Sequence, residues 1–267
     1  MRHLTYALSV LSIILLVGCK EDKKDKNNAE KLLAPTTDTL TLTDTLTLNI
    51  YTPLNERGEY GLDMSMNIEW PIKAATNDAL AKMQKSISGL LFGGELATTD
   101  VDFAMNAYSS RAIEQYMEEN SQENAYCDEE GNYFYTNWCE DIKGKFLEPY
   151  KRMISYQTYK YGYSGGAHGL DYLGCITFDM KTGEEIKQED LFVEDYESLL
   201  IKSLRANLPN SVEDIEWIYD RNIFPSEDFY ITPEGITYIY QRYEIGPYAI
   251  GIIQVTVPWK EIKDILK

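Results

Sequence analysis

The sequence is poor in histidine, and this limits the metal chemistry that it can support. Of its 267 residues only His3 and His168 are histidines, and His3 lies in a segment that we expect to be cleaved off. A catalytic zinc site needs about three protein ligands, commonly two or more of them histidine. The acidic run at 128–130 lacks the ligand spacing of a calcium loop. We therefore expect no metal site and no cofactor.

Long hydrophobic runs are also missing. The apolar run from Ala7 to Val17 is shorter than the about 20 residues that a membrane-spanning helix needs. Because Arg2 precedes it, the pattern predicts a signal peptide over residues 1–18. The ending Leu-Val-Gly-Cys resembles a bacterial lipobox, which predicts lipidation of Cys19 and anchoring through several acyl chains. An ordinary signal peptide with a chance cysteine is the alternative.

Residues 19–40 have few large apolar side chains and a dense mixture of charges. Such a segment cannot bury enough surface to offset the entropy of ordering it, so we predict a disordered tether. The order Cys-Lys-Glu-Asp at 19–22 resembles the signal that sends Bacteroidetes lipoproteins to the outer face of the outer membrane. We expect an outer-membrane lipoprotein at the cell surface, with a tether facing the periplasm as the alternative.

Basic residues are too few for nucleic-acid binding. The chain carries 43 acidic residues against 25 lysines and arginines, a net charge of −18. Phosphate backbones would repel such a chain, because Lys and Arg drive affinity for nucleic acids. The same charge would attract a basic protein and speed the encounter. Solubility at the cell surface is the simpler explanation of the charge, and both can hold at once.

The four cysteines have different expected roles. Cys19 is assigned to the lipid. Cys127 and Cys139 flank a turn-rich loop, and an exported chain can oxidise them. We predict that they form a disulfide, which would contribute roughly 3 kcal/mol by the loop-entropy estimate. Cys175 lies in an apolar run and is expected to be a buried thiol.

Hydrophobic periodicity predicts strands and helices in blocks. Leu and Thr alternate over 40–50, and apolar residues alternate over 62–68, which is typical of strands. Helical spacing follows over 77–92, with Asn77 as the expected N-cap, and over 101–119. The second half is predicted to form strands around one helix, followed by a short closing helix with Trp259, Ile262 and Leu266 on one stripe. This order predicts an α+β fold of mainly antiparallel sheets with helices packed on one face, in two sub-domains, 41–144 and 145–267.

Several motifs of the second half occur together in a known order. They are the tyrosine-rich strand that runs into YSGGAHG, the hairpin TFDMKTGEEIKQEDLF, the helix after it, and PEGITYIYQRYEIGPYAIGIIQVTVPWKEI. Together they resemble the C-terminal module of the RsiV/PdaC family over residues 145–267. That module occurs in lysozyme-sensing anti-sigma factors and as the non-catalytic region of a peptidoglycan deacetylase. The resemblance implies a binding role, with lysozyme or a cell-wall glycan as the ligand.

The chain shows neither the spanning helix of the anti-sigma factors nor a deacetylase domain with its metal ligands. We therefore expect a stand-alone, non-enzymatic lipoprotein whose folded part binds a basic protein such as lysozyme, or a cell-wall glycan. Two alternatives remain open. One is an enzyme that processes peptidoglycan or another glycan, and the other is a structural lipoprotein of envelope assembly.

The glycine-rich segment around His168 is the first candidate for ligand contact. Gly165, Gly166 and Gly169 surround this histidine, which suggests positive φ or a close approach to the backbone. Three readings stay open, namely a structural turn, a ligand-contacting loop and a catalytic histidine. The absence of a Gly-x-Ser-x-Gly motif disfavours a serine nucleophile.

The second candidate is the segment from 243 to 251. Gly246 and Pro247 break the chain between two strands, so Glu244, Pro247 and Tyr248 could be presented at a corner. Tyrosine is a favoured interface residue, because it offers a large area with a polar end. In that case Tyr248 would contribute to binding and little to stability. The alternative is a hairpin corner with the tyrosine packed inward.

Overall fold

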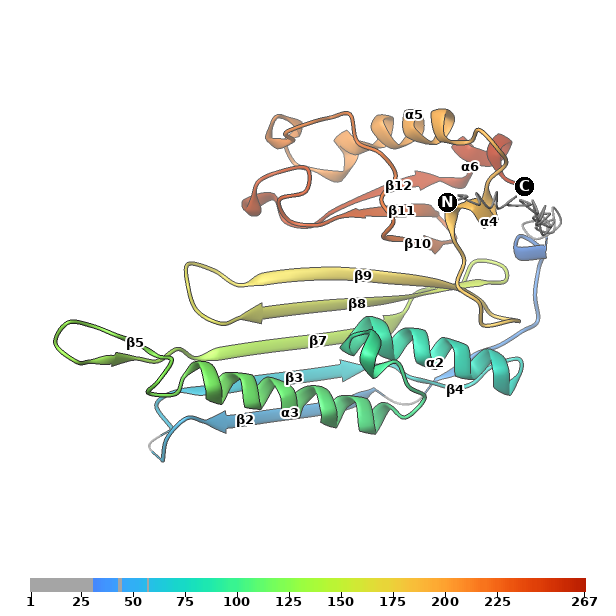
Figure 1. Cartoon of the computed structure of the whole chain (residues 1–267). Coiled ribbons are helices and arrows are strands. Elements are labelled where there is room, and N and C mark those ends of the chain that lie inside the picture. The colour runs from blue at the N-terminus through green and yellow to red at the C-terminus, as the bar shows by residue number, and fades with distance from the viewer. Residues whose placement is uncertain (1–30, 43–44, 57) are drawn as a thin grey trace, which may run out of the picture.

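The computed structural model of the protein describes residues 31–42, 45–56 and 58–267. It has an α+β fold with mostly antiparallel sheets, as the sequence predicts. Figure 1 shows a large sheet in the lower half, a smaller sheet above it, and helices against both. The predicted signal peptide, Cys19 and the first part of the tether lie outside the described residues.

The large sheet has five strands in the order β2-β3-β7-β8-β9. Neighbouring strands are antiparallel except β3 and β7, which are parallel because two helices connect them. The strands are β2 (Leu46–Pro53), β3 (Gly61–Ile68), β7 (Trp138–Phe146), β8 (Met153–Tyr163) and β9 (Leu170–Asp179). A short pair, β1 (Thr41–Leu42) with β4 (Pro71–Lys73), stands beside it.

Helices α2 (Asn77–Phe92) and α3 (Val101–Glu119) cover one face of this sheet. The N-cap of α2 is Thr76, one residue before the predicted cap Asn77, and its hydroxyl accepts a hydrogen bond from Ala79 N at 3.0 Å. Gly93, with φ 101°, is the C-cap of α2, and its N–H donates to Gly89 O. The apolar stripe of α2 then packs on the buried face of β3.

The core between helices and sheet follows the two periodicities. Alternate residues of β3 and helically spaced residues of α2 are fully buried, and they form one cluster: Leu62, Met64, Met66, Ile68, Met83, Ile87 and Leu91. Each such side chain contributes about 1.5–3 kcal/mol through the hydrophobic effect. The alternation over 62–68 therefore predicts correctly which side of the strand is inside.

The smaller sheet has three antiparallel strands in the order β10-β11-β12. They are β10 (Phe229–Thr232), β11 (Gly235–Tyr240) and β12 (Ile253–Pro258). Helix α5 (Glu197–Asn207) lies above this sheet with α6 (Trp259–Ile262), and the short α4 (Gln188–Leu191) precedes them. Every residue of β11 is buried, because β11 is the central strand of this sheet. Ile236, Tyr238 and Tyr240 of this strand belong to a second hydrophobic core.

The two sheets are joined through β8. Its Ser155 hydroxyl donates to Ile231 O at 3.1 Å and accepts from Ile231 N at 2.8 Å. Strands β8 and β9 therefore complete the large sheet and also support β10. The sub-domain boundary expected at 144/145 falls inside β7. The periodicity did not reveal this strand, since WCEDIKGKF mixes four apolar with four charged residues and its pairing is long-range.

Cys127 and Cys139 are free in the structure, so the predicted disulfide is wrong for this fold. Cys127 lies in the two-stranded hairpin of β5 (Tyr126–Cys127) and β6 (Tyr133–Phe134), opposite Tyr133. Cys139 lies in β7, where it pairs with Asp63 of β3 and Tyr163 of β8. The loop contains a hairpin of its own, and this places the two thiols in different sheets. Burial raises the pKa of Cys139.

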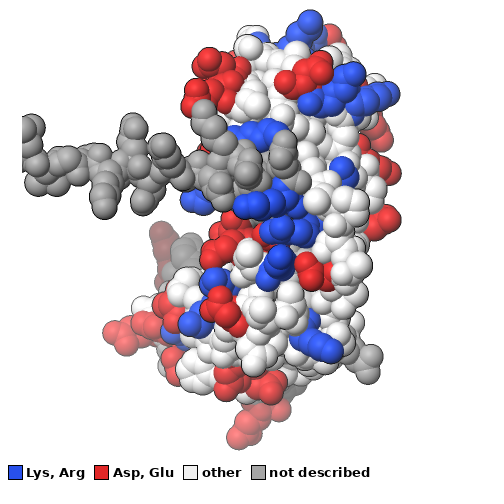
Figure 2. All heavy atoms as spheres, turned by 90° about the vertical axis from the view of Figure 1, so that its right-hand side faces the viewer, with Lys and Arg blue, Asp and Glu red and all other residues white. Residues whose placement is uncertain are grey.

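The described chain enters the fold at the end opposite the β5–β6 hairpin. Leu32 is buried there, and its carbonyl accepts a hydrogen bond from Arg152 N at 3.3 Å. Figure 2 shows this end, with Lys and Arg side chains gathered in a band across its middle and Asp and Glu side chains on either side.

Candidate functional site

The two segments that the sequence analysis singled out lie against each other. The first is the β8–β9 turn, residues 164–169, and the second is the β11–β12 loop, residues 241–252. The hydroxyl of Tyr248 donates to Gly169 O at 2.9 Å, although the two residues are 79 positions apart. We call this contact region the junction. It joins the end of the large sheet to the end of the small one (Figure 1).

The glycines of the turn are needed for two different reasons. Gly165 and Gly166 have φ values of 108° and 88°, which other residues rarely adopt. Gly169 lacks positive φ, but a Cβ there would stand 2.6 Å from Gly162 O and 2.5 Å from the Tyr161 hydroxyl. Both predicted reasons, positive φ and close approach, therefore occur in one turn.

His168 is held by three contacts. Its ring stacks on Tyr248 with centroids 3.9 Å apart and an interplanar angle of 23°. Nδ1 lies 3.1 Å from Gly169 O, and Nε2 lies 3.3 Å from the Tyr243 hydroxyl. A carbonyl can only accept, so in the neutral imidazole Nδ1 carries the proton and Nε2 accepts from the Tyr243 hydroxyl. A general base would use this same Nε2, which is already occupied.

Tyr248 is half-buried between two side chains and is not presented at the corner. The Arg242 guanidinium lies 4.3 Å from the centre of the Tyr248 ring, on which His168 also stacks. Arg242 further donates to Tyr248 O and to both carboxylate oxygens of Asp171, one of them at 2.8 Å. The Arg242 and Asp171 side chains are 21% and 10% exposed. This three-layer stack fixes the shape of the loop, so the inward packing that the sequence left open is the one found.

Glu244 and Pro247 stabilise the conformation of the β11–β12 loop. One carboxylate oxygen of Glu244 accepts from Gln241 N at 2.7 Å, and Glu244 N donates to Gln241 O at 3.1 Å. Pro247 precedes the 3₁₀ turn Tyr248–Ile250. Tyr243, with φ 67°, is 52% exposed, and its ring lies 5.8 Å from the ring of Tyr248. These contacts leave Tyr243 and the small exposed residues beside it to meet a ligand.

A cavity of about 380 Å³ opens beside the junction. Asp171, Arg242 and Tyr243 belong to both, and Glu140, Lys160, Leu170 and Tyr172 complete much of its lining. Sequence reasoning missed Asp171 and Arg242, since nothing in the local pattern joins residues 71 positions apart. The run QRYEIGPY did contain a signal, namely an arginine placed beside tyrosines at a predicted turn.

Two ionisable side chains that line this cavity have shifted pKa values. Burial raises the pKa of Glu140, against the hydrogen bond donated by Tyr108 and the charge of Lys160. Burial also lowers the pKa of Lys160, against the charge of Glu140. The pKa of Tyr108 is raised by burial and by the nearby Glu140 carboxylate. A partly buried acid beside a partly buried amine can exchange a proton with a ligand or bind a polar one.

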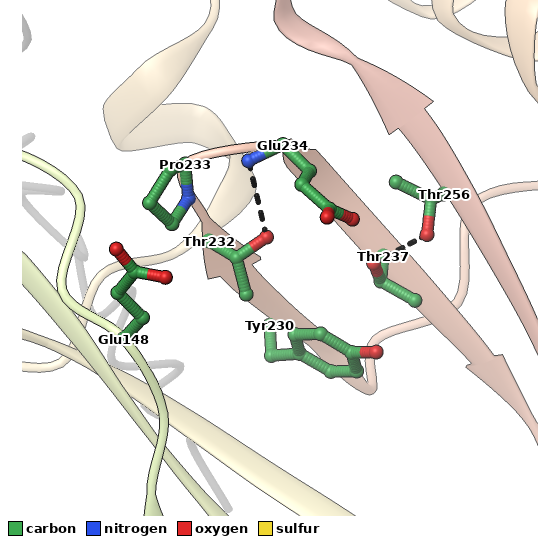
Figure 3. Close-up of a pocket in the computed structure, with 7 residues that line it drawn as sticks. All are labelled: Glu148, Tyr230, Thr232, Pro233, Glu234, Thr237 and Thr256. Carbon is green, nitrogen blue, oxygen red and sulfur yellow. Dashed lines mark hydrogen bonds between the residues drawn. The ribbon is translucent and has the colours of Figure 1, made fainter.

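A second cavity, of about 200 Å³, lies at the β10–β11 turn (Figure 3). Threonines line its floor, with the Thr237 and Thr256 hydroxyls 2.8 Å apart. Glu148 and Glu234 flank it from separate segments, and Tyr230 closes one side. Among the residues that line this cavity there is no aromatic stack and no ion pair, whereas the junction contains both, so the junction is the stronger candidate for a binding site.

The described residues contain neither a cluster of metal ligands nor a membrane-spanning helix. Within residues 31–42, 45–56 and 58–267, no three His, Cys, Asp or Glu side chains gather as a metal site would require. No helix in the same part of the chain is both long and apolar enough to cross a bilayer.

The fold and the junction define a class of protein: an α+β molecule in which two antiparallel units meet at an aromatic, arginine-braced corner. Residues 189–260, which include α5, the small sheet and the β11–β12 loop, match the family model described as "Protein of unknown function (DUF3298)". No curated protein matches the chain.

Two solved structures share the architecture. A DUF3298-family protein of Bacteroides fragilis is similar with a TM-score of 0.72 and 22% identity, covering 86% of this chain and 95% of its own. A DUF3298-family protein of Pseudomonas aeruginosa is similar with a TM-score of 0.61 and 17% identity, with the same coverage. At these identities the likeness supports the fold alone, and it extends over both sheets.

Proposed function

We propose that this protein is a cell-envelope lipoprotein, anchored through Cys19, that binds a basic protein such as a lysozyme, or a cell-wall glycan, at the junction. One observation carries the proposal. Two segments far apart in sequence build a rigid corner in which His168, Tyr248 and Arg242 stack, so a ligand meets a surface that is already ordered. Preorganisation of this kind reduces the entropy lost on binding.

Charge supports a basic ligand over a neutral one. The net charge of −18 raises the encounter rate with a cationic protein, and Glu244 and Tyr243 are exposed at the corner. The RsiV/PdaC-type resemblance, which covers both junction segments, points to the same ligand. A cell-wall glycan would use the exposed ring of Tyr243 instead of the charge.

Titration of lysozyme into the purified protein by calorimetry, at near-physiological salt, tests the proposal. Ala167 and Ala249 are exposed in the two junction segments, so Ala167→Lys with Ala249→Lys should repel a basic ligand and leave the fold intact. We expect binding to weaken by about tenfold or more. Ala75→Lys is the matched control, since Ala75 is exposed beside the N-terminus of α2, at the other end of the large sheet.

No heat with lysozyme at micromolar concentrations would reject the lysozyme form of the proposal. Binding of soluble peptidoglycan fragments that Tyr243→Ala abolishes would then support the glycan form. If neither ligand binds, the junction is not the site. Replacement of Cys19 by Ser should release the protein from membranes, and unchanged membrane retention would refute the anchor.

The cavity gives a specific reason to test an enzyme as the second candidate. Glu140 has a raised pKa beside an open cavity, and a general acid in glycan cleavage needs that property. Release of fragments from peptidoglycan by the wild type, lost in Glu140→Gln and kept in Glu148→Gln, would establish it. The same assay with His168→Ala tests the histidine directly.

A further inference from the structure

The β5–β6 hairpin carries exposed aromatic side chains that nothing in the described chain covers. It projects past the end of the large sheet at the left of Figure 1. Tyr126 is 71% exposed and Phe134 55% exposed, and the two form a cross-strand pair with ring centroids 5.6 Å apart. Tyr133 is exposed on the opposite face, stacked on Tyr135.

A two-stranded hairpin in water is marginally stable by itself, and exposed aromatic rings on both faces add an unfavourable contact with water. This hairpin is nevertheless well built. One carboxylate oxygen of Asp128 accepts from Asn132 N at 2.8 Å and Glu130 N at 3.1 Å, and the other accepts from Asn132 Nδ2 at 2.8 Å. Gly131, with φ 85°, completes the turn. The rings are therefore held in place for an external partner.

The charge around the hairpin selects the kind of partner. Residues 112–142 contain no Lys, Arg or His, and their acidic residues are Glu114, Glu118, Glu119, Glu123, Asp128, Glu129, Glu130, Glu140 and Asp141. Glu123, Glu129 and Glu130 are exposed on the hairpin and its base. A second copy of the chain would bring the same charges together, which is unfavourable. A neutral sugar would stack on the rings and donate hydroxyl hydrogen bonds to the carboxylates, but it would leave their negative charge unpaired.

We propose that the β5–β6 hairpin is a docking surface for a cationic, arginine-rich segment of a partner protein. An arginine places its guanidinium over an aromatic face and at the same time pairs with a carboxylate. Tyr126 and Phe134 supply adjoining faces, and Glu129 and Glu130 supply the carboxylates at the tip. The surface uses none of the junction residues, so it stands apart from the function proposed above.

The test is titration of a short oligo-arginine peptide into the full chain in detergent, followed by fluorescence anisotropy at two salt concentrations. Tyr126→Ser with Phe134→Ser keeps the net charge and removes the rings. We expect it to weaken binding by about tenfold. Phe103→Ser with Tyr219→Ser is the matched control, because these two rings are 59% and 66% exposed elsewhere and should leave binding unchanged.

Three further measurements complete the test. Glu129→Lys with Glu130→Lys should also weaken binding and reduce its salt dependence. An oligo-lysine peptide should bind more weakly than oligo-arginine, since the lysine ammonium lacks the planar guanidinium that stacks on a ring and pairs bidentately with a carboxylate. The junction variant Ala167→Lys with Ala249→Lys should bind oligo-arginine like the wild type.

Equal binding by all variants, or equal binding of both peptides, would mean a general response to net charge and would overturn the proposal. Binding of chitin oligosaccharides that depends on Tyr126 would identify a sugar surface instead. Dimers in sedimentation that Tyr126→Ser with Phe134→Ser abolishes would identify a self-interface. Thermal melts serve as the control for folding, and we expect each variant to melt like the wild type because the replaced side chains are exposed.

Discussion

The junction and the β5–β6 hairpin are built from the same kinds of residue and use them differently. At the junction, Tyr248 lies between His168 and Arg242, and its hydroxyl is hydrogen-bonded to Gly169 O. In the hairpin, Tyr126 contacts the Phe134 ring and is otherwise 71% exposed. Aromatic rings at the junction stabilise the fold, whereas those of the hairpin are available to a partner.

The difference shows that an aromatic-rich segment does not by itself identify a binding surface. The junction rings are satisfied within the chain, so a ligand there meets their edges and the exposed residues around them. The hairpin rings of Tyr126, Tyr133 and Phe134 contact one another or Tyr135 and stay between 43% and 71% exposed. Substitutions that remove contacts should therefore affect stability at the junction and binding at the hairpin.

The largest expected effect is the loss of the arginine brace. Arg242→Ala leaves the Asp171 carboxylate, only 10% exposed, without its cation. Removal of one partner of a buried pair costs about 3 kcal/mol or more. Urea unfolding should show this loss. Arg111→Ala is the control, because its pair with Glu95 is exposed and should contribute less than about 1 kcal/mol. Equal costs for the two variants would contradict a braced junction.

The direct comparison of the two regions pairs Tyr248→Ala with Tyr126→Ala. The first removes a ring packed against His168 and Arg242 together with a hydrogen bond, and should cost about 2 kcal/mol. The second removes an exposed ring and should change the free energy of unfolding by about 0.5 kcal/mol or less. Differential scanning calorimetry measures both. A stable Tyr248→Ala variant would restore the expectation that this tyrosine is a free interface anchor.

A smaller effect is expected from crowding in the β8–β9 turn. Gly169→Ala places a methyl group 2.6 Å from Gly162 O, and overpacking of this kind costs about 1–3 kcal/mol. Gly162→Ala, one strand away, has open space around its Cβ and serves as the control. We expect the thermal unfolding temperature to fall for Gly169→Ala and to stay unchanged for Gly162→Ala. If both variants melt like the wild type, the turn tolerates repacking and its glycines are not structural.

The smallest effect should be a pH dependence near the junction. Burial raises the pKa of Asp228, against hydrogen bonds that include one from Gln241. When a carboxyl has a higher pKa in the folded than in the unfolded protein, the folded protein loses stability as the pH rises above the pKa of the unfolded state, which is about 3.9 for Asp. Asp228→Asn should therefore be slightly more stable than the wild type at pH 7, and this gain should vanish near pH 4. A constant difference across that range would exclude Asp228 as its source.

The sequence by itself determined the elements that local pattern controls. Alternation over 62–68 and helical spacing over 77–92 predicted β3, α2 and their buried faces, because a residue's neighbours at period 2 or 3.6 decide which side packs inward. The glycines of 165–169 and the Gly-Pro break at 246–247 likewise located both junction segments. Such features need only the backbone geometry of a few consecutive residues.

Only the tertiary structure decided how these pieces combine. Strand β7 mixes apolar and charged residues and is defined by its partners β3 and β8, and the boundary expected at 144/145 lies within it. The thiols of Cys127 and Cys139 lie in different sheets, because Cys127 pairs within the β5–β6 hairpin and Cys139 belongs to β7. Asp171 and Arg242 meet across 71 positions, and no local pattern encodes that meeting. Long-range pairing depends on which surfaces of the whole chain are left to be buried, and that is settled only when the sheets pack.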